Sequence, residues 1–244
     1  METERRSDRT EQLARVIFAG ALTSLLIGCA MQGNNTPSPH HAHHPPHDHK
    51  FDDPDEWAAR WNDPNRDIWQ RPEEVIDIME IRTGMTVADI GTGTGYFVPH
   101  LSEAVGDSGR VLALDISIKM IEYVKETNPS TKNLTNVQAR VVLPDNPHLP
   151  GAGVDRILIV NTWHHIRDRI AYARTLSQSL KTDGRVIIVD YNLDAAEGPP
   201  QSLRMSPQQI VSELQAAGLA VQIVQESLPR HYVVVGRHNA HIAP

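Results

Sequence analysis

Three glycines at alternating positions, Gly91, Gly93 and Gly95, follow a short apolar run that begins at Val87 and ends in Asp89 and Ile90. The run predicts a buried parallel strand, and a helical pattern of apolar residues begins just after the glycines. A strand, a glycine turn and a helix start are typical of a nucleotide-type cofactor site at the carboxyl end of a sheet. Glycine allows the backbone to turn sharply and to approach a ligand without a Cβ in the way. The alternative is a glycine-rich turn that binds nothing.

The glycine spacing differs from the dinucleotide fingerprint G-x-G-x-x-G/A, because Tyr96 stands where that fingerprint has its third small residue. The pattern Asp89-x-Gly91-x-Gly93-x-Gly95 resembles motif I of the class I S-adenosylmethionine-dependent methyltransferases. The resemblance implies S-adenosylmethionine as cofactor, with the loop backbone against its amino-acid part and Asp89 beside its ammonium group. The cofactor contacts expected in this loop are Asp89, Gly91, Thr92, Gly93, Gly95 and Tyr96.

A second predicted strand, 110–116, ends in Asp115 and Ile116. A carboxylate at such a strand end can accept hydrogen bonds from both ribose hydroxyls, so Asp115 indicates an adenosine ligand in either cofactor class. Ile116 is a further candidate contact. Methyltransferases of this class often carry an acidic residue directly after the third strand, where this chain has Leu143. Asp145, two residues later, or the backbone is then expected to contact the adenine.

Candidate catalytic residues lie directly after the predicted strand 154–161 and at the carboxyl end of the predicted strand 185–191. The carboxyl ends of these strands flank the crevice of a doubly wound sheet. Asn161 is a candidate cofactor contact, and Trp163 is expected to face a substrate. A histidine can accept a proton near neutral pH. Of two adjacent histidines, one is expected to face inward and the other to cap the next helix; the alternative is that both are structural. The candidate catalytic residues are His164, His165, Asp190 and Tyr191.

The order of the remaining elements extends the resemblance over roughly residues 72–235. It implies an α/β fold: a Rossmann-like, doubly wound sheet of seven strands in the order 3-2-1-4-5-7-6, with strand 7 antiparallel and helices on both faces. Residues 181–185 resemble the turn before strand five in this family. Residues 168–180 predict a helix with Ile170, Ala173, Leu176 and Leu180 inward, and Ser206 and Pro207 predict the start of another.

The N-terminal region carries an apolar, uncharged stretch, 16–28, that is too short to span a bilayer and fits the core of a signal peptide. It ends in Leu26-Ile27-Gly28-Cys29, which resembles the bacterial lipobox. The resemblance implies a lipidated Cys29 and a protein anchored in the cell envelope, facing the periplasm, with the lipid as its only membrane attachment. An ordinary apolar helix is the alternative, and an unprocessed protein would stay in the cytoplasm.

Five segments follow from these patterns: a signal peptide at 1–28, a disordered His/Pro-rich linker at 29–50, a helical lid at 51–71, the methyltransferase domain at 72–237 and a disordered tail at 238–244. Trp69 and Gln70 of the lid are expected near the pocket mouth, unless its tryptophans simply pack on the sheet. The linker is either a solvated spacer or a weak site for Zn, Cu or Ni. Its histidines are His40, His41, His43, His44, His47 and His49.

The net charge and the number of cysteines restrict the class of protein further. A net charge of −7 does not indicate nucleic-acid binding, and a single cysteine excludes an intramolecular disulfide. We therefore expect a methyltransferase acting on a small-molecule acceptor, with the oligomeric state open. S-adenosylmethionine is made in the cytoplasm, so export would conflict with catalysis. This conflict leaves a non-catalytic, envelope-anchored protein that binds S-adenosylmethionine or a nucleoside as an alternative. An NAD-dependent oxidoreductase is a third reading that Tyr96 disfavours.

Overall fold

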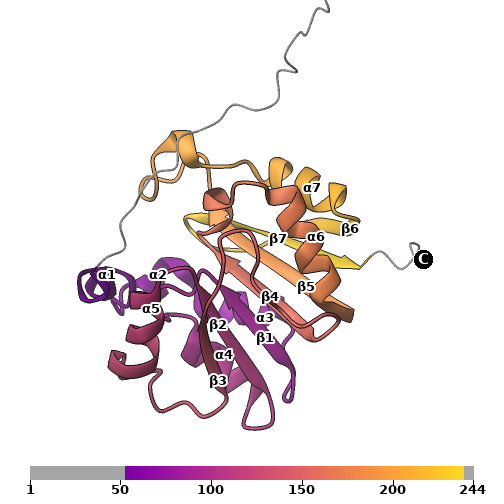
Figure 1. The fold of residues 1–244 in the computed structure, drawn as a ribbon. Helices are drawn as coiled ribbons and strands as arrows, with labels where there is room; N and C mark the ends of the chain where they lie inside the picture. The colour runs from indigo at the N-terminus through magenta and orange to yellow at the C-terminus, as the bar shows by residue number, and fades with distance from the viewer. Residues whose placement is uncertain (1–52, 239–244) are drawn as a thin grey trace, which may run out of the picture. The chain divides into compact units, whose positions relative to one another are not determined.

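A seven-stranded sheet organises residues 53–238, the part of the chain that the computed structural model describes (Figure 1). The strands are β1 (Thr86–Ile90), β2 (Arg110–Asp115), β3 (Val137–Val141), β4 (Val154–Val160), β5 (Leu180–Tyr191), β6 (Leu219–Val224) and β7 (His231–His238). Their order is β3-β2-β1-β4-β5-β7-β6. Neighbours from β3 to β5 are parallel, whereas β7 runs antiparallel to both β5 and β6. The predicted fold class, strand order and antiparallel strand are confirmed.

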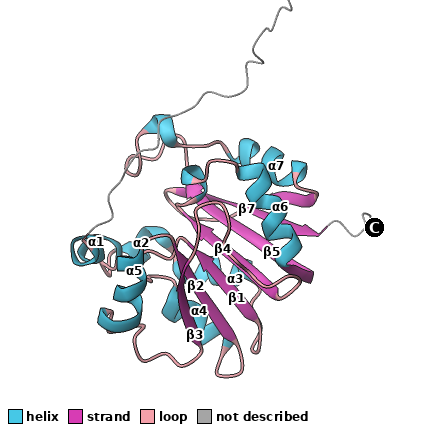
Figure 2. Cartoon of the chain, in the orientation of Figure 1, coloured by secondary structure: helices cyan, strands magenta, loops and turns pink. Residues whose placement is uncertain are grey.

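Helices cover both faces of the sheet (Figure 2). They are α1 (Pro54–Trp61), α2 (Arg66–Gln70), α3 (Pro72–Met79), α4 (Val98–Val105), α5 (Ile118–Glu122), α6 (Arg169–Ser179) and α7 (Pro207–Ala216), and a π-helical turn, Tyr123–Thr127, continues α5. One core layer joins the sheet to α6 and α7 through Leu176, Ile210 and Leu214. The other joins it to α3 and α4 through Val75 and Leu101. These two layers hold the strand ends rigidly at the edge where the site lies.

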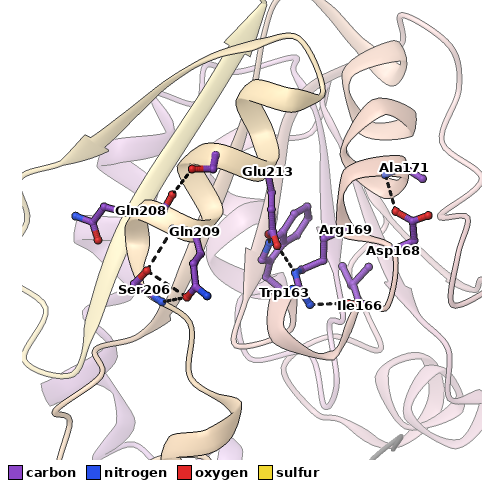
Figure 3. Close-up of polar contacts among 10 residues, drawn as sticks. Trp163, Ile166, Asp168, Arg169, Ala171, Ser206, Gln208, Gln209 and Glu213 are labelled. Atoms are coloured by element: carbon purple, nitrogen blue, oxygen red, sulfur yellow. Dashed lines mark hydrogen bonds and ion pairs between the residues drawn. The ribbon is translucent and has the colours of Figure 1, made fainter. Parts of the chain in front are cut away.

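Side-chain caps fix where the helices begin, because they satisfy N–H groups that have no partner inside the helix. Ser117 caps α5, and Ser206 caps α7 as predicted, where it forms a reciprocal capping box with Gln209 (Figure 3). The prediction that one of the paired histidines caps the next helix is wrong. Asp168 caps α6 instead, and its carboxylate accepts a hydrogen bond from the N–H of Ala171 at 3.1 Å.

Two further predictions for this region need correction. Ile170 is 36% exposed, because it lies in the first turn of α6, ahead of the buried face that begins at Tyr172. The helix ends before Leu180, which already belongs to β5. The predicted turn at 181–184 is present as a bulge within that strand, because Leu180 and Arg185 pair with Val154 and Arg156 of β4.

No helix within residues 53–238 is long and apolar enough to cross a bilayer. The same residues contain no group of three or more His, Cys, Asp or Glu side chains that could hold a metal ion. The predictions for the signal peptide, Cys29, the histidine linker and the tail beyond residue 238 lie outside the described residues.

Candidate active site

The glycine loop lies at the carboxyl end of β1 and adopts backbone conformations that favour glycine. Gly91, Gly93 and Gly95 have φ angles of 73°, 52° and 84°. A Cβ at Gly91 would lie 2.3 Å from the Oγ1 of Thr162, so no side chain fits between this loop and the turn after β4. A Cβ at Gly93 would lie 3.2 Å from the indole of Trp61 in α1. The loop therefore needs glycine for its backbone and for close packing, and α1 covers it.

Asp89 is buried at the end of β1, with 3% of its surface exposed. Its Oδ2 accepts a hydrogen bond from the hydroxyl of Thr92 at 2.7 Å. Burial raises the pKa of Asp89 to about 6; the Thr92 bond and the charge of Arg66 oppose this rise, and the charge of Asp115 adds to it. A buried carboxyl group of this kind favours a cationic neighbour, because a nearby positive charge stabilises its ionised form.

Asp115 ends β2 and braces the glycine loop. Its Oδ2 accepts from the N–H of Gly93 and its Oδ1 from the N–H of Ser117, each at 2.9 Å. Burial raises its pKa. Since an ionised carboxylate offers about four lone-pair sites, both oxygens can accept a further hydrogen bond, as two ribose hydroxyls would require. Two apolar side chains are exposed just after strands β2 and β3. Ile116 follows β2 and is 59% exposed, and Leu143 follows β3 and is 54% exposed.

Asp145 lies in an exposed turn that is closed by the pairing of Leu143 with Asn146. Asn161, at φ 52°, has its side-chain oxygen buried without a hydrogen-bond partner. Its backbone N–H donates to the carbonyl of Val189 at 2.9 Å, which ties the end of β4 to β5.

His164 and Asp190 form a buried pair where β4 and β5 end. The Nδ1 of His164 lies 3.0 Å from both carboxylate oxygens of Asp190, and the two side chains are only 3% and 1% exposed. A carboxylate beside Nδ1 favours the tautomer that carries its proton there, which leaves the Nε2 lone pair as a proton acceptor. His165 is exposed, and its ring centre lies 4.2 Å from that of His164. The structure thus joins two of the four candidate catalytic residues.

Trp163 is fully buried, so the prediction that it faces a substrate is wrong. Its Nε1 donates to one carboxylate oxygen of Glu213 in α7, and the Nε of Arg169 donates to the other, each at 2.8 Å (Figure 3). Arg169 also donates to the carbonyl of Ile166 at 3.0 Å. This network fixes the short 3₁₀ turn that carries His164. The sequence signal for this network was Glu213, an acidic residue beside the buried positions of α7.

Tyr191 lies apart from the His164–Asp190 pair, because successive side chains of a strand point to opposite faces. Its backbone pairs with His231, the first residue of β7, and the two ring centres are 4.3 Å apart. His231 is fully buried and stacks on Trp69 of α2, with ring centres 5.6 Å apart and planes inclined by 18°. His231 was not predicted as a site residue, although an antiparallel strand necessarily brings its first residue to this edge.

Arg66 of α2 lies over the ring of Tyr96, with its guanidinium carbon 3.9 Å from the ring centre. It donates to the carbonyl of Trp61 at 2.8 Å and to the Oε1 of Gln70 at 3.1 Å. The hydroxyl of Tyr96 in turn donates to the carboxylate of Asp67. Tyr96 therefore holds α2 against the glycine loop, and nothing in the sequence pattern had identified Arg66.

Comparison with known proteins identifies the family. A model described as "Methyltransferase domain" matches residues 81–230. The chain belongs to this methyltransferase family. It is 28% identical over 125 residues to the ubiquinone/menaquinone biosynthesis C-methyltransferase UbiE of Enterobacter sp. strain 638, covering 51% of this chain and 49% of that protein. The chain thus spans about half the length of the curated relatives it matches.

Solved structures agree with this assignment. A SAM-dependent methyltransferase from Aquifex aeolicus superposes with a TM-score of 0.69 and 29% identity, over 75% of this chain and 97% of that one. A TehB-like SAM-dependent methyltransferase from Corynebacterium glutamicum, 18% identical, shares the fold with a TM-score of 0.58 over 76% of this chain and 98% of that chain. Residues 81–230 form an S-adenosylmethionine-dependent methyltransferase domain. Its buried Asp89, glycine loop and Asp115 fit that cofactor.

Proposed function

We propose that this methyltransferase methylates a small-molecule acceptor and that His164 takes the proton the acceptor loses. The observation that carries the proposal is the contact of the His164 Nδ1 with both oxygens of Asp190 at 3.0 Å. A base oriented by a buried carboxylate is a recurrent arrangement for proton transfer. The small acceptor is supported by the relatives, which are named for ubiquinone/menaquinone biosynthesis.

The cofactor supplies a methyl group on a sulfonium, whose leaving group is already activated. Asp89 and the glycines of the loop would hold its amino-acid part, and Asp115 would hold its ribose. The main task left to the protein is to align the acceptor with the methyl group, since correct orientation lowers the barrier substantially. Proton transfer to His164 adds to this, and Asp190 stabilises the imidazolium that results.

The segment before α3 is proposed as a lid over this site. The hydroxyl of Thr94 in the glycine loop donates to the Oδ1 of Asn62 at 2.7 Å, and Tyr96 donates to Asp67. Both bonds join the lid to the loop that would hold the cofactor. A lid in this place would exclude water from the transferring methyl group.

The test uses the full-length protein, S-adenosylmethionine with a radiolabelled methyl group, and a probe panel of phenol, 1-naphthol, 1,4-naphthalenediol, benzoate and benzylamine. With the best probe, His164→Gln and Asp190→Asn should each lower kcat by about 10²-fold or more, the usual contribution of a proton-transfer group. Cofactor affinity should stay within a factor of about three, or roughly 0.7 kcal/mol. His165→Gln is the matched control, because its side chain is exposed.

Full turnover in both variants would leave alignment alone to explain catalysis. Loss of cofactor binding in a folded variant would place the pair in the wrong half of the site. Either result would overturn the assignment of His164 as the proton acceptor.

We also propose that the protein is anchored to the cell envelope through a lipid on Cys29. The support is the lipobox-like Leu26–Cys29 sequence after a short apolar stretch. Catalysis outside the cytoplasm would require S-adenosylmethionine to reach the envelope. A protein that keeps its first residues would instead work in the cytoplasm, where the cofactor is made.

A further inference from the structure

We propose that Arg66, in the lid, binds the carboxylate of the cofactor's methionine part, so that Arg66 and Asp89 together recognise its two opposite charges. The inference rests on the cofactor placement proposed above and does not depend on the acceptor. The methionine part carries its ammonium and its carboxylate on the same carbon atom. A partner for the carboxylate must therefore lie near the partner of the ammonium, which would be Asp89.

The backbone of the glycine loop has already committed most of the donors that could hold this carboxylate. The N–H groups of Gly91 and Thr92 both donate to one carbonyl at the end of β2, at 2.8 and 3.0 Å. The N–H of Gly93 donates to Asp115, and that of Gly95 donates within the loop, each at 2.9 Å. The side chains at the ends of β1 and β2 are carboxyl groups, which repel another one. The carboxylate therefore needs a positively charged side chain from outside the loop.

Arg66 is a cation within electrostatic reach of Asp89. Burial raises the pKa of Asp89, and among the charges around it that of Asp115 adds to the rise while that of Arg66 opposes it. The charge of Asp89 acts on Arg66 in turn. A positive charge that stabilises an ionised group at this place also stabilises an anion bound next to it.

Arg66 has hydrogen-bond donors to spare. It donates to the carbonyl of Trp61 and to the side-chain oxygen of Gln70, and both acceptors are neutral. Among the side chains of residues 53–238, its Nε is one of five buried nitrogen or oxygen atoms that have no hydrogen-bond partner. Burial lowers the pKa of Arg66 to about 10, because its charge is partly removed from water. A carboxylate would offset this cost, since its two oxygens can accept two parallel bonds from a guanidinium.

Tyr96 fixes the position of Arg66 relative to the glycine loop. Tyr96 follows Gly95 directly, and the guanidinium carbon of Arg66 lies 3.9 Å from the centre of its ring. The hydroxyl of Tyr96 donates to Asp67, the next residue of α2. The guanidinium is thus held in place before the cofactor binds, which reduces the side-chain entropy lost on binding. Such a site selects the complete cofactor over adenosine compounds that lack the carboxylate.

The experiment measures binding by calorimetry on the full-length protein. The ligands are S-adenosylhomocysteine, its decarboxylated analogue, which keeps the amine, and its deaminated analogue, which keeps the carboxylate. Arg66→Met removes the charge and keeps an unbranched side chain over Tyr96, and Arg66→Lys keeps a charge but loses the paired donors. Arg60→Met is the matched control, because Arg60 is an exposed lid arginine whose guanidinium carbon lies 5.9 Å from the ring centre of Trp57.

The wild type should bind S-adenosylhomocysteine about ten- to a hundredfold more tightly than the decarboxylated analogue, the effect of a charge-assisted hydrogen bond. Arg66→Met should weaken S-adenosylhomocysteine binding by a similar factor and change the affinity for the decarboxylated analogue by less than about threefold. The deaminated analogue should weaken in parallel with S-adenosylhomocysteine. Arg66→Lys should keep part of the preference, and Arg60→Met should bind all three ligands as the wild type does.

Three results would overturn the inference. Equal loss of affinity for S-adenosylhomocysteine and its decarboxylated analogue in Arg66→Met would mean that Arg66 only supports the structure of the lid. A wild type that binds these two ligands equally well would exclude a charged partner for the carboxylate, whether or not the variants fold. An unchanged affinity of Arg66→Met for the deaminated analogue would assign Arg66 to another part of the cofactor. A wild type that does not bind S-adenosylhomocysteine at all would instead contradict the cofactor placement itself.

Discussion

Replacing Asp89 by asparagine should change how the stability of the cofactor-free protein depends on pH. Burial raises the pKa of Asp89 from 3.8 to about 6. Between these two values the folded protein binds more protons than the unfolded chain, so its stability falls as pH rises. The contribution is fully present below pH 3.8 and is lost as pH rises through about 6.

The size of the effect follows from the pKa difference, since each pKa unit corresponds to about 1.4 kcal/mol. Ionised Asp89 should therefore cost the fold roughly 3 kcal/mol near neutral pH. Between about pH 4.5 and about pH 7.5, the free energy of unfolding of the wild type should fall by roughly 2 kcal/mol relative to Asp89→Asn. The measured quantity is the difference in free energy of unfolding between the two proteins at each pH. In its change with pH, the constant cost of the new amide and the titration of other groups cancel.

Urea denaturation followed by tryptophan fluorescence measures this difference. Thr92→Val should make the loss of stability with rising pH larger, because Thr92 donates the hydrogen bond that lowers the pKa of Asp89. Asp77→Asn on the exposed surface of α3 is the control and should leave the difference unchanged. S-adenosylmethionine should flatten the wild-type profile, since its ammonium favours the ionised carboxylate. Parallel profiles for wild type and Asp89→Asn would refute the argument from burial.

Three further predictions concern other parts of the protein. Asp115→Ala should weaken S-adenosylmethionine binding by about ten- to a hundredfold in calorimetry, because a charge-assisted hydrogen bond contributes roughly 1.5–3 kcal/mol; unchanged affinity would contradict its role at the ribose. Glu213→Gln should lower kcat more than cofactor affinity, because it weakens the bonds that hold Trp163 and Arg169 beside the catalytic turn; equal losses in both would contradict a positioning role. Mass spectrometry of the protein from its native membrane should show acyl chains on Cys29 and loss of residues 1–28; a soluble protein with an intact first peptide would contradict lipidation.

The placement of the glycine loop and of the two carboxylates at the ends of β1 and β2 was predictable, because its signals are local. Asp89, the glycines and Asp115 stand at strand ends whose apolar runs mark them in the sequence. Short-range periodicity and turn chemistry are enough to place such residues at one edge of a parallel sheet. Their number and spacing also distinguish this loop from a dinucleotide site.

The part of the candidate site at the ends of β5 and β7 depends on long-range contacts that no local sequence pattern shows. Helix α2 has five residues, too few to show a helical period, and it carries Arg66, Trp69 and Gln70. His231 joins them from 161 positions beyond Gln70, through the antiparallel pairing of β7. The contact of Trp163 with Glu213 is likewise long-range. Because Trp163 stands next to two histidines, the sequence indicated that it faces a substrate. The structure instead buries its indole in the core.

The strand order divides the sheet into two halves that meet where β1 pairs with β4. Strands β3, β2 and β1 bear Asp115 and Asp89, whereas β4, β5 and β7 bear His164, Tyr191 and His231 or lead into them. The two halves share ladder bonds only between β1 and β4. The loop at 192–206 belongs to the second half and can thus change length or sequence without disturbing the first. The loop at 225–230 is tied to both, because Ser227 bonds to Glu74 of α3 and Leu228 packs in the core layer that contains Val87 of β1. Such an architecture lets a lineage exchange the compound it methylates while it keeps the same methyl donor.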